Sequence, residues 1–284
     1  MASQFPAVPT SVPPTAGVAA VLADLREMVA EQFQYRELLF ALTRRDLLLR
    51  YRQTLMGFAW AILMPVTYML VFSLIFTRVG AVKTGGTPYP IFAYTGLLPW
   101  NFLASSLRFS VGSLLANRTL ITKVYFPREI LPFSVILTSL VDFAVAGIVL
   151  AGLLVWYKVH VTSALLFLPV VVLVQIVFVA AITLLVSLAN LFFRDVKYLL
   201  EIVITLWMLA SPVVYPVERV GGKLGGLLAL NPMAPILNAY RSILIHGELP
   251  DAGRFAYAAI VSILLLIASW LLFHRTEPQI AETI

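Results

Sequence analysis

The chain has 284 residues, of which 61% are hydrophobic and 12% are charged. Soluble globular proteins contain about 45–50% apolar and about 25% charged residues. This composition, with a mean hydropathy of +0.94, therefore excludes an ordinary soluble domain and indicates a polytopic membrane protein. The sequence contains no cysteine, which excludes a disulfide framework and a thiolate metal site. We assign the formal charge of +6 to membrane topology rather than to nucleic-acid binding, because basic residues orient membrane chains.

The segment before the first predicted span has two parts. Residues 1–17 contain four prolines and no charged residue, a composition that predicts a disordered tail rather than a cleaved signal peptide. Residues 18–53 interleave leucines with arginines, which is typical of a helix lying in the cytoplasmic membrane interface. A fully solvated helix is disfavoured because it would expose those leucines. The remaining residues, 54–284, form the predicted transmembrane domain.

Six stretches of the transmembrane domain are apolar and long enough for membrane-spanning helices. They are residues 56–77, 90–115, 130–157, 164–193, 199–215 and 255–273. If the N-terminus is cytoplasmic, 12 of the 20 lysines and arginines lie on that side and seven on the other. Since cytoplasmic connections carry the excess of basic residues, we predict an all-α integral membrane protein with both termini in the cytoplasm.

The connection between the fifth and sixth spans contains two further apolar pieces, at 224–230 and 234–245, separated by Asn231 and Pro232. Both pieces are too short to cross a bilayer. Irregular backbone at membrane depth persists only where protein or a water-filled cavity surrounds it. We therefore predict two short re-entrant helices that enter from the outer side.

Signatures of independent energy conversion or catalysis are absent from the sequence. The glycine-rich run at 221–226 contains Lys223 but has neither the spacing nor the Ser/Thr of a nucleotide-binding loop. The three histidines, His160, His246 and His274, lie far apart, and no metal site is expected from them. These absences disfavour an enzyme acting alone, and they indicate that the energy for any transport comes from a partner.

Two ionisable residues lie deep inside predicted spans, Arg108 in the second and Asp142 in the third. Counted from the cytoplasmic boundary at about 1.5 Å per residue, their depths are similar. We predict a structural ion pair between them, with a proton relay as the alternative. Proton-driven transport would require more acids within the spans.

Six short motifs follow one another along the predicted topology. They are YRQTLMGFAW at 51–60, GLLPW at 96–100, KVYFPREILP at 123–132, NLFFRDV at 190–196, SPVVYP at 211–216 and NPM at 231–233. In this order they resemble the membrane subunits of bacterial ABC-2 type polysaccharide exporters. The nearest resemblance is to the O-antigen permease family called Wzm, with teichoic acid and capsule permeases as relatives. The resemblance runs from about residue 37 to the C-terminus.

The resemblance implies a type V exporter-like half-transporter in the bacterial inner membrane. Two copies would form the channel, and two copies of a separate ATPase subunit would hold ATP and Mg²⁺, so that this chain itself binds no cofactor. The implied substrate is a lipid-linked polysaccharide such as O-antigen. Alternatives are teichoic acid, capsule or a smaller lipid or drug as cargo, and, in a different class, an intramembrane enzyme or scaffold, which would require polar catalytic residues at one depth.

Aromatic side chains are the predicted lining of the channel, because sugar rings present C–H faces that stack on aromatic rings. The resemblance implies that the first and fifth spans line it, and ordinary helix packing is the alternative use of the same residues. The candidates are Trp60, Tyr68, Phe72, Phe76, Trp207 and Tyr215.

Basic residues before the first span are predicted to contact the pyrophosphate of the substrate or, as the favoured alternative, anionic lipid headgroups. They are Arg44, Arg45, Arg50 and Arg52.

Two cytoplasmic connections are predicted to contact the ATPase. In the first, exposed aromatics among charges are typical of interfaces, and the alternative is a topology signal. In the second, at Arg194 and Asp195, the alternative is capping or a local ion pair at a helix end. The candidates, with Tyr125 and Phe126 expected to be exposed, are Lys123, Tyr125, Phe126, Pro127, Arg128, Glu129, Arg194 and Asp195.

Overall fold

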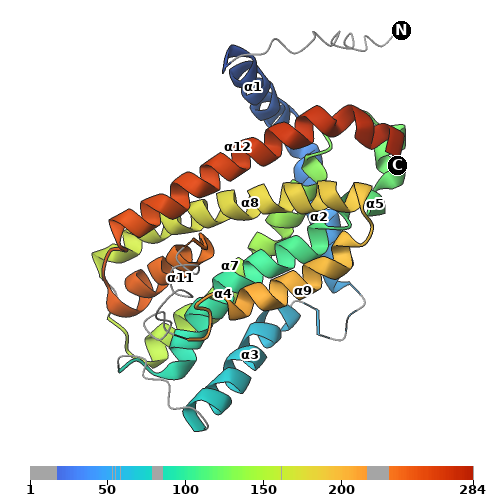
Figure 1. Ribbon diagram of the computed structural model, residues 1–284. Helices are drawn as coiled ribbons and strands as arrows, with labels where there is room; N and C mark the ends of the chain where they lie inside the picture. The colour runs from blue at the N-terminus through green and yellow to red at the C-terminus, as the bar shows by residue number, and fades with distance from the viewer. Residues whose placement is uncertain are drawn as a thin grey trace.

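The computed structural model describes residues 18–52, 54, 56–57, 59–78, 86–160, 162–215 and 230–283. Every regular element in these ranges is a helix (Figure 1), which confirms the all-α prediction. The predicted tail at 1–17 and most of the first predicted re-entrant piece, residues 224–229, lie outside the described residues.

The helices follow the predicted apolar segments closely, with short extra turns between them. In chain order they are α1 Val18–Gln34, α2 Arg36–Tyr51, α3 Ala59–Arg78, α4 Tyr89–Ser110, α5 Ser113–Ala116, α6 Arg118–Lys123, α7 Ile130–Trp156, the 3₁₀ helix η1 Ser163–Phe167, α8 Leu168–Phe192, α9 Val196–Leu209, α11 Met233–Arg241, the π-helical turn η3 Ser242–His246 and α12 Ala252–Thr283.

Four of the described helical segments are long and apolar enough to cross a membrane: Ala59–Phe76, Ile130–Trp156, Ser163–Phe192 and Ala252–Ile280. Helix α4 has 22 residues but includes Asn101 and Arg108, and it does not meet the same measure of length and composition. Helix α9 has 14 residues, about 21 Å at 1.5 Å per residue, which is shorter than the hydrocarbon core. The six-span count and the orientation therefore stay predictions.

Helix α9 ends earlier than predicted, at Leu209 rather than at residue 215. The reason is local: Pro212 cannot continue a helix, and the residue before a proline avoids the α conformation. The predicted second span is also interrupted, since α4 ends at Ser110 and the short α5 follows after Gly112.

The long helices pack into a bundle with α4 near its centre. Helices α8 and α12 lie side by side along one flank, α4 and α7 occupy the middle, and α3 lies on the opposite flank against α4 and α7 (Figure 1). Helix α4 is buried along nearly its whole length. It therefore carries much of the apolar core, together with residues of α7, α8 and α11.

The predicted interface helix is two helices, α1 and α2, which meet at Tyr35. Helix α2 packs on α7, and α1 reaches the C-terminal part of α12, where Arg275 Nη2 lies 3.1 Å from Asp24 Oδ2. Leu42 of α2 is buried, whereas Leu49 is 69% exposed. The helical character is confirmed, and placement at the membrane interface stays a prediction.

A buried arginine joins the end of α9 to α11, the short helix observed where the second re-entrant piece was predicted. Arg241 donates hydrogen bonds of 2.6 Å to the carbonyl oxygens of Pro212 and Val213. Its Cζ also lies 4.0 Å from the centroid of the Phe92 ring on α4. These carbonyl and ring contacts compensate much of the charge on the buried Arg241 guanidinium. They also hold the turn after α9 against α4 and α11.

Asn231 completes the same junction. Its Oδ1 accepts hydrogen bonds from the backbone N–H of Met233 and from Trp207 Nε1, at 3.1 and 3.0 Å. Its Nδ2 donates to Ser211 Oγ at 2.8 Å. The SPVVYP and NPM motifs are thus parts of one hydrogen-bonded unit.

Candidate functional site

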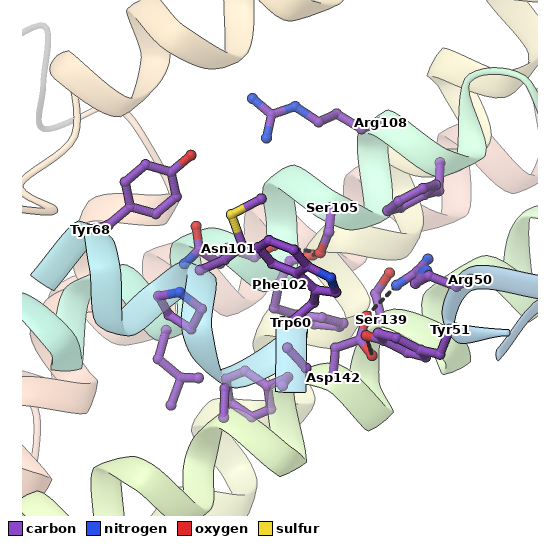
Figure 2. A pocket seen from close by; sticks show the side chains of 17 residues that line it. Arg50, Tyr51, Trp60, Tyr68, Asn101, Phe102, Ser105, Arg108, Ser139 and Asp142 are labelled. Carbon is purple, nitrogen blue, oxygen red and sulfur yellow. Dashed lines mark hydrogen bonds and ion pairs between the residues drawn. The ribbon is translucent and has the colours of Figure 1, made fainter. Parts of the chain in front are cut away.

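A cavity of about 340 Å³ lies among α2, α3, α4 and α7 (Figure 2). Its wall combines charged, polar and aromatic side chains within a mostly apolar bundle. The charged and polar lining residues are Arg50, Tyr51, Asn101, Ser105, Arg108, Ser139 and Asp142, and the aromatic ones are Trp60, Tyr68, Phe102, Phe109 and Phe143.

Asp142, in the middle of α7, is the centre of the charged wall. Arg50 Nη1 and Tyr51 OH, both from the last turn of α2, donate to its Oδ2 and Oδ1 respectively (Figure 2). The Arg50 guanidinium also lies over the Phe109 ring, at 3.8 Å. Burial, reinforced by the hydrogen bond to Asp142, raises the pKa of Tyr51 above its ordinary value, so the phenol stays a donor. The end of α2 is therefore tied to the interior of α7.

The predicted ion pair between Arg108 and Asp142 is wrong. Arg108 Nε lies 2.9 Å from Glu201 Oε2 on α9, and its side chain points away from Asp142 (Figure 2). Equal depth along two helices does not bring side chains together, because helix rotation decides which neighbour each side chain faces. The Asp142 carboxylate is reached instead by Arg50, from a helix outside the predicted spans.

Two polar atoms in the cavity wall have no hydrogen-bond partner in the described part of the chain. They are Asn101 Nδ2 and Ser139 Oγ, and both are buried. The neighbouring Ser105 hydroxyl donates a hydrogen bond to the backbone carbonyl oxygen of Asn101 at 2.6 Å. An unpaired buried polar group costs about 1–3 kcal/mol. The cavity is therefore suited to a ligand, or ordered water, that brings hydroxyl groups.

The aromatic residues predicted on α3 divide into two groups. Trp60 and Tyr68 line the cavity and are 39% and 46% exposed. Phe72 and Phe76 pack against the core instead, with ring centroids 6.2 Å apart and Phe76 lying 5.5 Å from Tyr89. Four residues on one stretch of helix therefore serve two different environments.

The two aromatics predicted on the fifth span do not line this cavity. Trp207 makes edge-to-face contacts with Trp100 and Phe178, at 5.9 and 6.0 Å between centroids. Tyr215 donates its hydroxyl proton to the carbonyl oxygen of Leu209 at 2.8 Å. Their role in a channel stays a prediction.

The four arginines predicted to bind phosphate occupy different surroundings. Arg50 is at the cavity, whereas Arg45 pairs with Asp46 at 2.8 Å. Arg44 and Arg52 are exposed on the outside of the bundle. Of the four, only Arg50 therefore lies at the candidate site, and headgroup contact by the exposed pair stays a prediction.

The predicted ATPase-coupling segment before α7 has one outward and one inward aromatic residue. Tyr125 is 70% exposed, but Phe126 is 1% exposed and belongs to an apolar cluster with Leu42 and Phe273. The prediction that Phe126 is exposed is therefore wrong. Exposure changes abruptly within this non-helical stretch: Val124 and Tyr125 are exposed, whereas Phe126 and Pro127 are buried.

The remaining coupling candidates also separate into exposed and internal residues. Lys123, Arg194 and Asp195 are exposed, while Pro127 is buried. Arg128 and Glu129 turn toward α12, where Arg128 Nη1 lies 3.0 Å from Glu277 Oε1. Contact with a partner stays a prediction for the exposed residues.

Sequence reasoning missed Tyr51, His274 and Glu277. Tyr51 opens the first motif, directly after Arg50, but no local pattern indicates Asp142 as its partner. His274 and Glu277 are three residues apart on α12, a spacing that places both on one helix face and that was available in the sequence.

Several long apolar helices around a cavity with a polar wall define a multi-pass membrane protein. The chain belongs to the ABC-2 type transporter family, whose sequence profile matches residues 37–245. This finding confirms the resemblance drawn from the six motifs.

Relatives with named transport roles match nearly the whole chain. The chain is 36% identical over 259 residues to the O-antigen export system permease protein RfbA of Myxococcus xanthus, covering 90% of this chain and 99% of that protein. It is 29% identical to an RfbA protein of Klebsiella pneumoniae, covering 87% and 94%. It is 23% identical to the polysialic acid transport protein KpsM of Escherichia coli, covering 84% and 92%.

Proposed function

We propose that this chain is the permease subunit of an ATP-driven exporter that moves a lipid-linked polysaccharide of the O-antigen kind across the bacterial inner membrane. The observation that carries the proposal is the 36% identity to an O-antigen export permease over 90% of the chain. A capsule-type polymer is the second candidate cargo, favoured by the likeness to the polysialic acid transport protein.

The energy for export comes from a separate subunit in this proposal. The sequence has no nucleotide-binding loop, so ATP and Mg²⁺ belong to a cytoplasmic ATPase, with two copies of each subunit in the complex. The surface offered to that ATPase consists of four exposed residues. They are Lys123 at the end of α6, Tyr125 shortly after it, and Arg194 and Asp195 between α8 and α9.

The cavity provides the chemistry that a phosphate-linked sugar requires. Arg108 is the available cation, because its pair with Glu201 has both side chains about half exposed, at 45% and 55%. Neither side chain of this pair is enclosed by the bundle, so the Arg108 guanidinium is accessible to a phosphate that enters the cavity. Asn101 and Ser139 offer hydrogen bonds to sugar hydroxyls, and Trp60 offers a stacking face.

Removing the cavity aromatics is expected to slow export. Trp60→Ala and Tyr68→Ala each delete a stacking surface that contributes about 0.5–1.5 kcal/mol, which corresponds to roughly a two- to tenfold lower rate. The measurement is ATP-dependent translocation of lipid-linked polysaccharide in vesicles containing this chain and its ATPase subunit.

Trp156→Ala is the matched control for this experiment, since Trp156 is 81% exposed at the end of α7 and does not line the cavity. If Trp60→Ala and Tyr68→Ala export at the wild-type rate, as the control is expected to do, the cavity takes no part in export. Translocation that persists without the ATPase subunit would overturn the proposed function itself.

Replacing Tyr125 with alanine is expected to weaken association with the ATPase without lowering the melting temperature, because the Tyr125 ring is exposed. Phe126→Ala is the contrasting variant: it removes a buried ring and is expected to cost about 3–5 kcal/mol of stability. Co-purification of the two subunits measures their association, and thermal melting of each variant measures its stability. Normal complex formation by the Tyr125 variant would contradict the coupling role.

A further inference from the structure

Three potential metal ligands meet where the last turns of α12 approach the loop before α7. His274 Nδ1 lies 3.4 Å from Glu129 Oε1 and 3.9 Å from Glu277 Oε2. One ligand atom from each of the three residues lies within 4.8 Å of the others. Two carboxylates and one imidazole, from segments 145 residues apart, therefore converge on one point.

The spacing of these atoms is long for hydrogen bonds and close to that of metal ligands. N–H···O hydrogen bonds have donor–acceptor distances of about 2.7–3.2 Å. Zinc is bound by nitrogen and oxygen at about 2.0–2.2 Å in tetrahedral geometry, which separates neighbouring ligand atoms by roughly 3.3–3.6 Å. The 3.4 Å between His274 and Glu129 falls in this range, and the 3.9 Å between His274 and Glu277 is slightly wider.

Glu129 supplies an independent sign of a missing ligand. Its side chain is 1% exposed, and its Oε2 atom is buried with no hydrogen-bond partner among the residues that the structure describes. Leaving a buried carboxylate oxygen without a compensating group is costly. A cation bound beside Oε1 would compensate the charge of this buried carboxylate.

The adjacent arginine leaves that position open. Arg128 donates from its backbone N–H and from Nη1 to Glu277 Oε1, at 3.2 and 3.0 Å, so Glu277 Oε2 remains on the side of His274. Glu31 of α1 adds a third carboxyl to the surroundings. It lies close enough to Glu129, His274 and Glu277 to interact with them electrostatically.

We propose that Glu129, His274 and Glu277 bind one divalent cation of the zinc class. An imidazole with two carboxylates is a three-ligand set that zinc accepts with a water in the fourth position, whereas Mg²⁺ and Ca²⁺ prefer oxygen ligands alone. The side chains of His274 and Glu277 are 21% and 12% exposed, which gives the ion access. Bound there, the ion ties the C-terminal turns of α12 to the loop that carries Tyr125.

This site was not expected from the sequence, where the histidines were judged only against close neighbours. Glu277 follows His274 by one turn of α12, but Glu129 is brought in by the fold. The proposal does not depend on the cargo of the transporter, so its test is independent of export.

The test is zinc binding to the full-length protein in detergent, with its purification tag removed and its metals stripped by a chelator. We expect one zinc ion per chain after incubation and desalting, measured by mass spectrometry of the metal, and little retention of Mg²⁺. We also expect zinc to raise the melting temperature, because a ligand that binds only the folded state stabilises it.

His274→Ala and Glu277→Gln are expected to weaken zinc binding by at least roughly tenfold, the scale seen when groups around a metal are removed. His246→Ala is the matched control, because this exposed histidine lies in η3, outside the cluster. Circular dichroism reports whether each variant is folded. No retained zinc in the wild type, or equal retention by folded His274→Ala, would overturn the site and leave the cluster as an ion-pair network.

Discussion

Gly96→Ala is expected to be the most damaging single substitution in the described bundle. A Cβ atom at this position would lie 2.2 Å from the carbonyl oxygen of Val213 and 2.6 Å from Arg241 Nη2. The Val213 carbonyl cannot move aside without breaking its 2.6 Å hydrogen bond to Arg241. Overpacking costs about 1–3 kcal/mol and a lost charged hydrogen bond about 1.5–3 kcal/mol. We therefore expect a loss of about 3–6 kcal/mol, measured as a large fall in melting temperature and in the yield of folded protein.

Gly147→Ala and Gly152→Ala are the matched controls, because both glycines lie within α7 and an added Cβ meets no atom within 4 Å. Alanine favours a helix over glycine by about 0.8–1 kcal/mol, so these variants are expected to be as stable as the wild type or slightly more stable. If Gly96→Ala has the same melting temperature as the controls, the turn after α9 can move aside at little cost. That result would contradict the conclusion that Arg241 holds this turn in place.

The helices were predictable because the signal for them is local. A long apolar run sets the length of α7 and α8, whose observed bounds differ little from those predicted. Helix α12 instead continues ten residues past the predicted end at residue 273, to Thr283. The errors lie at the ends and breaks, such as the break at Tyr35 and the early end of α9. These depend on single residues and on what each turn packs against.

The site was predictable only in part, because contacts between helices depend on their rotation. Trp60 and Tyr68 were predicted to line a channel, and both line the cavity, whereas Phe72 and Phe76, predicted for the same role, pack against the core. The partner of Asp142 was not predictable, since Arg50 lies 92 residues away. The hydrophobic pattern of the sequence did not indicate that its helix, α2, packs against α7. The inward turn of Phe126 was missed for the same reason: exposure depends on tertiary contacts.

The motifs that carried the family resemblance coincide with contacts between distant segments. Gly96 of GLLPW contacts the turn of SPVVYP, and Asn231 of NPM fastens that turn. Arg128 of KVYFPREILP bonds to α12, and Arg50, next to YRQTLMGFAW, bonds to α7. These motifs therefore mark places where the bundle is fastened as well as places that a partner or substrate reaches.

Asp142→Asn is expected to lower stability by about 3 kcal/mol. The side chains of Arg50 and Asp142 are only 14% and 17% exposed, and removing one member of such a pair leaves the other charge buried without compensation, at about 3–5 kcal/mol. The lower end applies because both side chains retain some exposure and the asparagine still accepts a hydrogen bond from Tyr51. Thermal or chemical unfolding of the purified protein measures the loss.

The double variant separates the ion pair from simple packing. Arg50→Met combined with Asp142→Asn removes both charges, and we expect it to be more stable than the sum of the single losses predicts. Glu201→Gln is the control, since it breaks the less enclosed pair with Arg108 and is expected to lower stability by less than Asp142→Asn does. Additive losses in the double variant would show that Arg50 and Asp142 act separately, and the end of α2 would then be fastened to α7 by other contacts.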